Sequence, residues 1–281
     1  MQEVIAMARD AVVAGKDVGD AALLRALVEA NMNQDGDAKR LTDDELLSNI
    51  FVFFLAGHET SAHALSFTFI LLALYPDVQQ KVYEEALQLW PDGKTSDSSY
   101  KIDMPQLEYT LATFRETIRL YPAEARLAKL VNQDTTIAVA LFTPHKDGAN
   151  HHGDVRKQPI LLPRGSVVLA DILGVHRNPL HWGSDCKDFK PERFIDTDTY
   201  KWPRHAFLTF SAGPRGCIGS RFSLTESVCI LATLVRRYEV LLPDHVAKME
   251  RSQQIRYMTR WTHGVTMTPV HGQVKLRKRA F

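Results

Sequence analysis

The chain has 281 residues, with 34 basic and 33 acidic side chains that leave a net charge of +1. This length and its 45% hydrophobic content suffice for a sizeable globular core. A near-neutral chain lacks the electrostatic footprint of a nucleic-acid-binding protein, so that class is excluded. Three cysteines with no C-x-x-C pair predict neither a disulfide framework nor a structural zinc site, and their thiols are expected to stay reduced in a compartment that faces the cytosol.

The sequence also argues against targeting and membrane-spanning segments. No secretory signal pattern is expected, because Met1 leads directly into an amphipathic helical pattern. The most apolar stretch, 50–75, is interrupted by His58, Glu59 and His63, so we expect no transmembrane span in this chain.

The first half of the sequence has helical periodicity. A helix is predicted over 21–30, where Asp20 is placed to cap it. Further helices are predicted over 76–90 and about 105–121, and proline marks their boundaries.

One predicted helix is unusually long. Thr42 and Glu45 fit the N-cap and N3 positions of a capping box, and the helix that they open can run to Tyr75. Its stretch FVFFLA (51–56) is apolar on all sides. We therefore expect this helix to lie inside the protein.

The second half changes character. The runs TTIAVALF (135–142) and PILLPRGSVVLADI (159–172) predict a small β-sheet. The segment 145–158 resembles an insertion and holds three histidines, but without ligand spacing a polar loop is favoured over a metal site. A last helix is predicted after Gly219, followed by short strands. A basic tail is interpreted as a solvated terminus; it comprises Lys275, Arg277, Lys278 and Arg279.

The loop FSAGPRGCIG (Phe210–Gly219) places a cysteine in unusual surroundings. A structural cysteine normally sits among aliphatic residues, whereas Cys217 is surrounded by glycines. Gly213 and Gly216 allow the backbone to turn and to point amides at the sulfur. Helical periodicity resumes after the loop, so the sulfur lies near a helix N-terminus, where a thiolate is favoured.

A thiolate held in this way can be a nucleophile or a metal ligand. A nucleophilic cysteine needs a histidine base nearby, and the sequence leaves that open. A phosphate-binding loop is disfavoured, because the glycines follow the spacing G-x-x-G-x-x-G and no strand and acidic residue accompany them.

The full pattern is Phe-x-x-Gly-x-Arg-x-Cys-x-Gly, formed by Phe210, Gly213, Arg215, Cys217 and Gly219. Here the sequence resembles the haem-binding loop of cytochromes P450 of the eukaryotic microsomal type, whose iron has a cysteine thiolate ligand. The resemblance implies that Cys217 ligates the iron of haem b and that Arg215 pairs with a haem propionate. Phe210 would shield the sulfur, and Gly219 would let the helix lie against the porphyrin.

A second segment, AGHETS (56–61), lies within the long helix. Gly57 in a helix interior costs about 1 kcal/mol against alanine, and the Thr60 hydroxyl can bond back to the Ala56 carbonyl. Taken alone, the segment fits small-residue helix packing with a solvated Glu59. Beside the cysteine loop, it resembles the oxygen-activation motif of the P450 family, which implies that oxygen binds against Ala56 and Gly57. Glu59 and Thr60 would be the acid and alcohol that handle protons.

A third segment contains Glu116 and Arg119, spaced as an ordinary surface ion pair would be. Their helix, however, is apolar on both sides, so we expect Glu116 to be buried and to need a partner. The spacing resembles the family's Glu-x-x-Arg motif, and PERF (191–194) resembles the motif that supplies the third member, Arg193. The resemblance implies that these three residues brace the haem loop and perform no chemistry.

Two further positions are carried over from the family. Arg126 follows Pro122 where many members place another propionate contact. His176, in the sequence HRNP, also occupies a familiar position, and it is either a neighbour of a propionate or a histidine with satisfied hydrogen bonds in a loop.

The fold that the resemblance implies is mainly α with a small β-sheet, the C-terminal portion of the P450 fold, over 1–281 as a single region. The implied reaction is monooxygenation of a small, apolar organic substrate with O2. Electrons would come from NADPH through a reductase. A full-length version is expected at the endoplasmic reticulum membrane, which it would contact only through the N-terminal half that this chain lacks.

Three other hypotheses stay open. A P450-fold isomerase or dehydratase would need no external electrons. An inactive truncated fragment would act at most as a haem-binding or scaffold module. A cysteine hydrolase would contain no haem.

Overall fold

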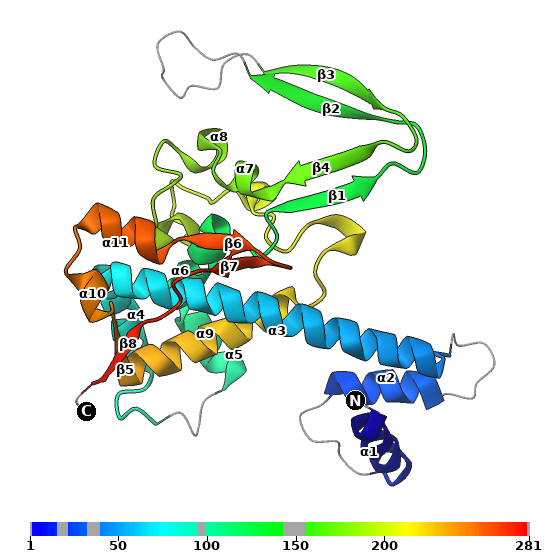
Figure 1. Cartoon of the computed structure of the whole chain (residues 1–281), viewed down its shortest axis with the longest axis horizontal. Helices are drawn as coiled ribbons and strands as arrows, with labels where there is room; N and C mark the ends of the chain where they lie inside the picture. The colour runs from blue at the N-terminus through cyan, green and yellow to red at the C-terminus, as the bar shows by residue number, and fades with distance from the viewer. Residues whose placement is uncertain (1, 16–21, 33–39, 95–98, 143–154, 280–281) are drawn as a thin grey trace. The chain divides into compact units, whose positions relative to one another are not determined.

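The computed structural model describes residues 2–15, 22–32, 40–94, 99–142 and 155–279. They divide into two compact units, Met1–Thr60 and Ser61–Phe281, each of which is described by itself. Helices predominate, and the strands of the described ranges form two-stranded antiparallel sheets (Figure 1). This composition confirms the predicted fold class.

The first unit consists of α1 (Gln2–Val13), α2 (Ala22–Met32) and the N-terminal part of α3 (Asp43–Leu74). A small apolar core joins these helices and consists of Ile5, Ala8, Val28 and Leu46. The helix predicted over 21–30 corresponds to α2, whereas its expected cap, Asp20, lies outside the described residues.

The predicted capping box at the start of α3 is confirmed. The Thr42 amide donates to the Glu45 carboxylate at 2.8 Å, and the Glu45 amide donates to the Thr42 hydroxyl at 3.2 Å. These bonds from Thr42 hold the pKa of Glu45 below its usual value. The helix ends at Leu74, one residue before its predicted end.

The prediction that α3 lies inside the protein is correct only for its C-terminal part. Phe67 and Leu72 are completely or almost completely buried, whereas Phe51 and Phe54 are 50% and 67% exposed. In the first unit, the apolar core with α1 and α2 includes residues of α3 only up to Ile50. An all-round apolar pattern predicts apolar surroundings, but it does not say which segment provides them.

The second unit has its main core between four helices. The C-terminal part of α3 packs with α4 (Pro76–Leu89), α6 (Glu108–Leu120) and α9 (Ser220–Arg237) (Figure 1). Between α4 and α6 lie the short α5 (Tyr100–Asp103) and η1 (Met104–Gln106). The helix starts predicted at Pro76 and after Gly219 are confirmed. Each of the four long helices contributes buried side chains to this core, for example Leu72 of α3, Val82 of α4, Phe114 of α6 and Leu231 of α9.

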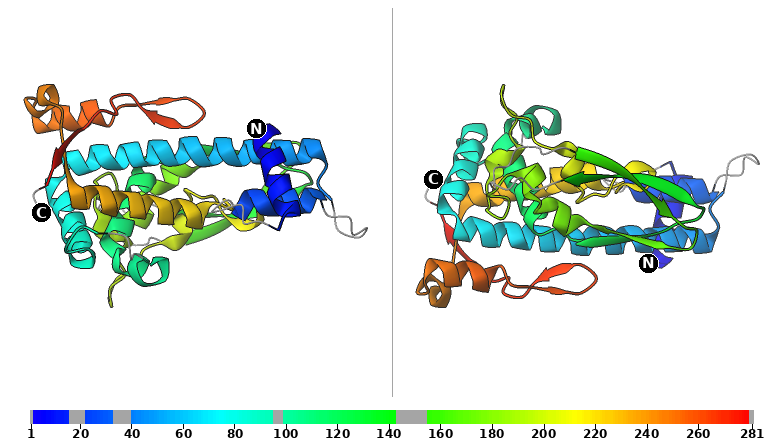
Figure 2. Two further views of the ribbon diagram at one scale, coloured as in Figure 1. Left: turned by 90° about the horizontal axis from the view of Figure 1, so that it is seen from below. Right: turned by 90° about the horizontal axis from the view of Figure 1, so that it is seen from above.

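A second core lies on another side of α3 (Figure 2). Here α10 (Asp244–Ala247), α11 (Arg251–Met258) and the pair β6 (Trp261–His263) and β7 (Met267–Pro269) cover the helix. Its buried side chains include Phe67, Ile70, Met258 and Met267. The middle of the second unit is therefore a helix covered on both sides.

Two antiparallel pairs form the β-rich part. β1 (Arg126–Leu130) pairs with β4 (Val167–Asp171), and β2 (Thr135–Phe142) pairs with β3 (Val155–Leu162). The sequence analysis missed β1. It also placed 155–158 in a loop, where the structure has the start of β3; the three histidines of that predicted loop lie outside the described residues.

The basic tail is solvated at Lys275, Arg277 and Lys278, which are exposed as expected, but it is also part of a strand whose pairing the sequence analysis did not predict. β8 (Lys275–Lys278) pairs with β5 (Tyr238–Leu241). The guanidinium of Arg279 then lies over the ring of Tyr83, 4.0 Å from its centre, and donates to the Val235 carbonyl. Strand pairing and these contacts fasten the tail to α4 and α9, because arginine stacks on aromatic faces.

Short elements lead from β4 to the cysteine loop. They are α7 (Ile172–His176), α8 (Pro179–Trp182), η2 (Pro191–Phe194), η3 (Arg204–Ala206) and η4 (Gly213–Arg215). Within the ranges that the structure describes, no single helix passes a length and hydropathy test for crossing a membrane. The bent pair of α3 and α4, which meet at 109°, passes it by length and composition only.

We predict that Thr42→Ala lowers the free energy of unfolding by about 1 kcal/mol, because the Glu45 amide at the start of α3 loses its acceptor. The change is measured by urea denaturation. Thr42→Ser keeps the hydroxyl and is the control. A loss of equal size in both variants would contradict the capping role.

Candidate active site

The cysteine loop is shaped by its own backbone. Gly213 has a φ of +77°, and Ser211 also has a positive φ of 60°. The Gly216 amide donates to the Gly213 carbonyl at 2.9 Å, and the Cys217 amide donates to the Phe210 carbonyl at 2.8 Å. These turns hold Cys217 two residues before Gly219, the N-cap of α9.

The thiol of Cys217 is exposed and has apolar neighbours in the sequence that are exposed as well. Ile218 is 84% exposed and Phe222 is 70% exposed. A Cβ on Gly219 would lie 3.9 Å from the Cys217 sulfur, so a side chain there would stand beside the thiol. An exposed thiol is accessible to a metal ion, which it can ligate once it is deprotonated.

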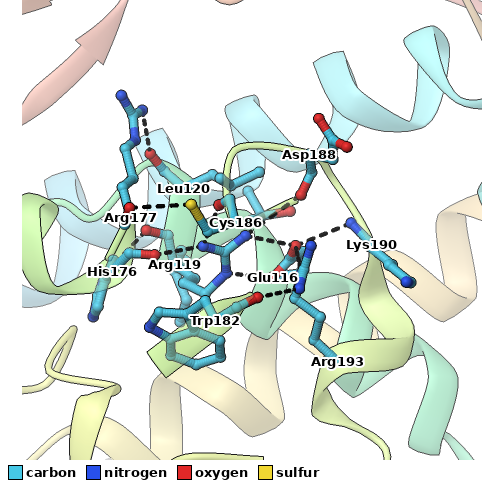
Figure 3. A network of polar contacts seen from close by, with 12 residues as sticks. Glu116, Arg119, Leu120, His176, Arg177, Trp182, Cys186, Asp188, Lys190 and Arg193 are labelled. Atoms are coloured by element: carbon cyan, nitrogen blue, oxygen red, sulfur yellow. Dashed lines mark hydrogen bonds and ion pairs between the residues drawn. The ribbon is translucent and has the colours of Figure 1, made fainter. Parts of the chain in front are cut away.

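Helix α6 carries a fully buried ion pair (Figure 3). The Arg119 guanidinium donates to both oxygens of Glu116, at 2.6 and 2.8 Å. Its remaining N–H groups donate to the carbonyls of His176, Cys186 and Asp188. All donors of Arg119 therefore have acceptors, as a buried guanidinium requires.

Glu116 has two further partners. The Lys190 amide donates to it at 3.0 Å, and Arg193 forms an ion pair with it at 3.4 Å. Burial raises the pKa of Glu116, while the hydrogen bonds and charges of these partners oppose that rise. Arg193 also forms an ion pair with Asp185 at 2.7 Å, so two arginines face two carboxylates. The structure thus brings together the three residues that the sequence analysis grouped.

His176 is completely buried, and both of its ring nitrogens have backbone partners. One lies 2.9 Å from the Arg119 carbonyl, and the other accepts from the Leu208 amide at 2.8 Å. Burial lowers its pKa to about 4, so the ring is neutral at pH 7. His176 thus has satisfied hydrogen bonds, as one of the two predicted alternatives has it, while a place beside a propionate stays a prediction.

The other predicted residues are placed as follows. Phe210 is partly buried against the main core of the second unit. Arg215, in η4, and Arg126, at the start of β1, are exposed cations of the second unit. Their predicted contacts with propionates stay predictions.

Residues 56–60 of the segment AGHETS belong to the first unit, whereas Ser61 and the cysteine loop belong to the second. The Thr60 hydroxyl donates to the Ala56 carbonyl at 2.7 Å, as predicted. A Cβ on Gly57 would meet nothing within 4 Å, so the surface beside it is open. The roles of Glu59 and Thr60 stay predictions.

Sequence analysis missed several parts of the buried network. Asp185, and the carbonyls of Cys186 and Trp182 that accept from the two arginines, were not expected. One part of this region could have been predicted from the sequence. Asn178 before Pro179 is typical of a helix start, and the Asn178 side chain does cap α8. Carbonyl acceptors leave no trace in side-chain chemistry.

Comparison with known proteins supplies the family. The sequence profile of the family "Cytochrome P450" matches residues 1–276. "Cytochrome P450 monooxygenase 124" of Postia placenta is 35% identical over 262 residues, covering 92% of this chain and 46% of that protein. "Cytochrome P450 3A31" of Mesocricetus auratus is 31% identical, covering 77% of this chain and 38% of that protein.

A third relative is "Cytochrome P450 monooxygenase prx9" of Penicillium rubens, 30% identical over 87% of this chain and 43% of that protein. The chain therefore belongs to the cytochrome P450 family, as its motifs indicated. It spans less than half the length of each of these relatives.

We predict that Arg119→Lys lowers the free energy of unfolding by about 3 kcal/mol or more, because one ammonium cannot satisfy Glu116 and the surrounding carbonyls. Guanidinium denaturation measures the loss. The control is Lys81→Met, which removes an exposed ion pair with Glu192 and should cost less than about 1 kcal/mol. If both variants lost the same free energy of unfolding, the buried ion pair would be no more important for stability than the exposed one.

A second prediction concerns pH. The pKa of His176 is about 4 in the folded chain and 6.5 ordinarily, so the unfolded chain takes up a proton that the folded chain refuses. Its contribution to stability is complete above pH 6.5 and is lost as the pH falls towards 4, by about 3 kcal/mol. The difference in pH slope between the wild-type chain and His176→Gln, measured by denaturation, reports this residue. Equal slopes would refute the assignment.

Proposed function

We propose that this chain carries the haem-binding part of a haem-thiolate monooxygenase. The observation that carries the proposal is the preformed loop that presents the exposed Cys217 thiol before α9, in a member of the cytochrome P450 family. A small apolar organic molecule, O2 and a reductase-type electron donor fed by NADPH are the proposed reactants and partner. When bound, haem b would supply oxygen activation and a route for electrons.

The residues of the second unit fit that group. Cys217 would be the thiolate ligand, and the exposed apolar side chains of Ile218 and Phe222 offer surface to a macrocycle. Arg215 and Arg126 are exposed cations suited to propionates. Phe210, held against the core, would shield the sulfur from water.

Two residues of α3 are proposed to handle protons. The Thr60 hydroxyl donates its proton in a hydrogen bond to the Ala56 carbonyl. The lone pairs of the hydroxyl oxygen can then accept a hydrogen bond from another group. Glu59, the preceding residue, would exchange protons with solvent as a general acid. An apolar substrate is consistent with the apolar stretch 51–56 of the same helix.

A second candidate is a haem-binding module without catalysis. It is favoured by one observation, the exposure of the large apolar side chains of Phe51 and Phe54 on α3. A cysteine hydrolase is disfavoured, because no hydrogen bond between Cys217 and a histidine occurs in the described part of the chain. Haem titration followed by an assay for NADPH-dependent oxidation separates the candidates, since the module binds haem without turnover.

We predict that Cys217→Ala abolishes thiolate ligation of haem. The measurement is the absorption of the reduced, CO-treated chain, where a red-shifted Soret band marks thiolate ligation. The control is Cys229→Ala, which removes the other exposed cysteine and should leave the band unchanged. If the Cys217→Ala chain keeps the band, the ligand assignment is wrong.

We also predict that Thr60→Ala uncouples NADPH consumption from product formation, because the hydroxyl that positions protons is lost. The ratio of product to NADPH consumed should fall, and Thr60→Ser should preserve it. An unchanged ratio in Thr60→Ala would contradict the role of the hydroxyl.

A further inference from the structure

The C-terminus of α6 is held by the segments that lead to the cysteine loop. A helix leaves its last four carbonyls without partners inside the helix. In α6 the Thr117 carbonyl accepts from the Tyr121 amide at 2.8 Å. The next three carbonyls accept from side chains of other segments: Thr209 on Ile118 at 2.9 Å, His176 on Arg119 at 2.9 Å and Arg177 on Leu120 at 3.0 Å.

His176 differs from the other two because its ring also binds Leu208, which leads into the loop. A carbonyl can only accept and an amide can only donate, so Nδ1 carries the proton towards Arg119 and Nε2 accepts from Leu208. The ring of Phe207 stacks on it at 5.6 Å with an interplanar angle of 17°. One buried imidazole therefore joins the end of α6 to Leu208, two residues before the loop (Figure 3 shows its place beside Arg119).

The hydrogen bonds continue from Leu208 to the thiol residue. The Leu208 carbonyl accepts from the Ser211 amide at 2.8 Å, and the Phe210 carbonyl accepts from the Cys217 amide at 2.8 Å. Ser211 has the positive φ that reverses the chain between these bonds. The position of Cys217 therefore depends, through two hydrogen-bonded turns, on the backbone of Leu208, which His176 holds in place.

We propose that His176 is a positioning residue for Cys217, which it places by bridging the Arg119 carbonyl and the Leu208 amide. The bridge connects the buried ion-pair network to the residue that leads into the loop with the thiol. The statement that the Cys217 sulfur binds haem rests on the proposed function. The positioning of Cys217 by His176 rests only on the hydrogen bonds of this chain. Loss of the acceptor would leave the Leu208 amide without its partner and would loosen the backbone up to Cys217.

The two nitrogens of the ring can be removed separately. In His176→Asn the amide nitrogen lies near the Nδ1 position and can still donate to Arg119, but nothing reaches Leu208. In His176→Gln the longer side chain brings its oxygen near the Nε2 position and keeps the acceptor for Leu208. A role in stability alone would weaken both variants alike, whereas positioning through Leu208 separates them.

The test is deuterium exchange of the haem-free full chain, read at the amides of Leu208 and Cys217. We expect exchange about tenfold faster in His176→Asn and within about twofold of wild type in His176→Gln. Thr209→Val removes the neighbouring bond to Ile118 without touching the imidazole and should leave the Leu208 amide protected. Equal exchange in the Asn and Gln variants, or wild-type protection in His176→Asn, would overturn the proposal.

A second readout follows addition of haem. The fraction of bound haem with the red-shifted CO band should fall in His176→Asn and be retained in His176→Gln. If the wild-type chain lacks this band, the proposed function fails while the exchange experiment still decides the role of His176. If His176→Asn does not fold, His176→Gln decides alone: protection of Leu208 supports the bridge and its loss refutes it.

Discussion

The ion pair of Glu116 and Arg119 is completely buried, and a buried pair is tolerated only when hydrogen bonds satisfy its remaining atoms. This requirement organises the second unit. The guanidinium needs three carbonyls, and these come from a stretch that the chain must fold over the end of α6. Residues far from α6 in sequence are thereby fixed in space. The short helices and turns before the cysteine loop are tied to α6 by hydrogen bonds to this charged pair.

Periodicity and local motifs predicted the helices of the chain well. The capping box at Thr42 and the start of α9 after Gly219 depend on residues close in sequence, so local patterns suffice for them. The burial of Glu116 was also predicted, because α6 is apolar on both sides. The Phe-x-x-Gly-x-Arg-x-Cys-x-Gly pattern indicated the family before the comparisons did.

Long-range relationships were not predictable in the same way. The role of His176 was left between two possibilities, since a histidine in a loop does not reveal which carbonyl and amide flank its ring. The strand pairing of the basic tail was not predicted, because its partner, β5, lies about forty residues earlier in the chain. The exposure of Phe51 and Phe54 was not predicted either. An apolar helix predicts that other residues pack against it, but the pattern does not identify those residues.

The contact between Arg279 and Tyr83 has a consequence for biosynthesis. Helix α4 leaves the ribosome almost two hundred residues before the strand β8 and the guanidinium that complete its surroundings. Contacts between such distant segments form late and slow the search for the native state. The ring of Tyr83 on α4 therefore gains its arginine partner only when almost the whole chain has been synthesised.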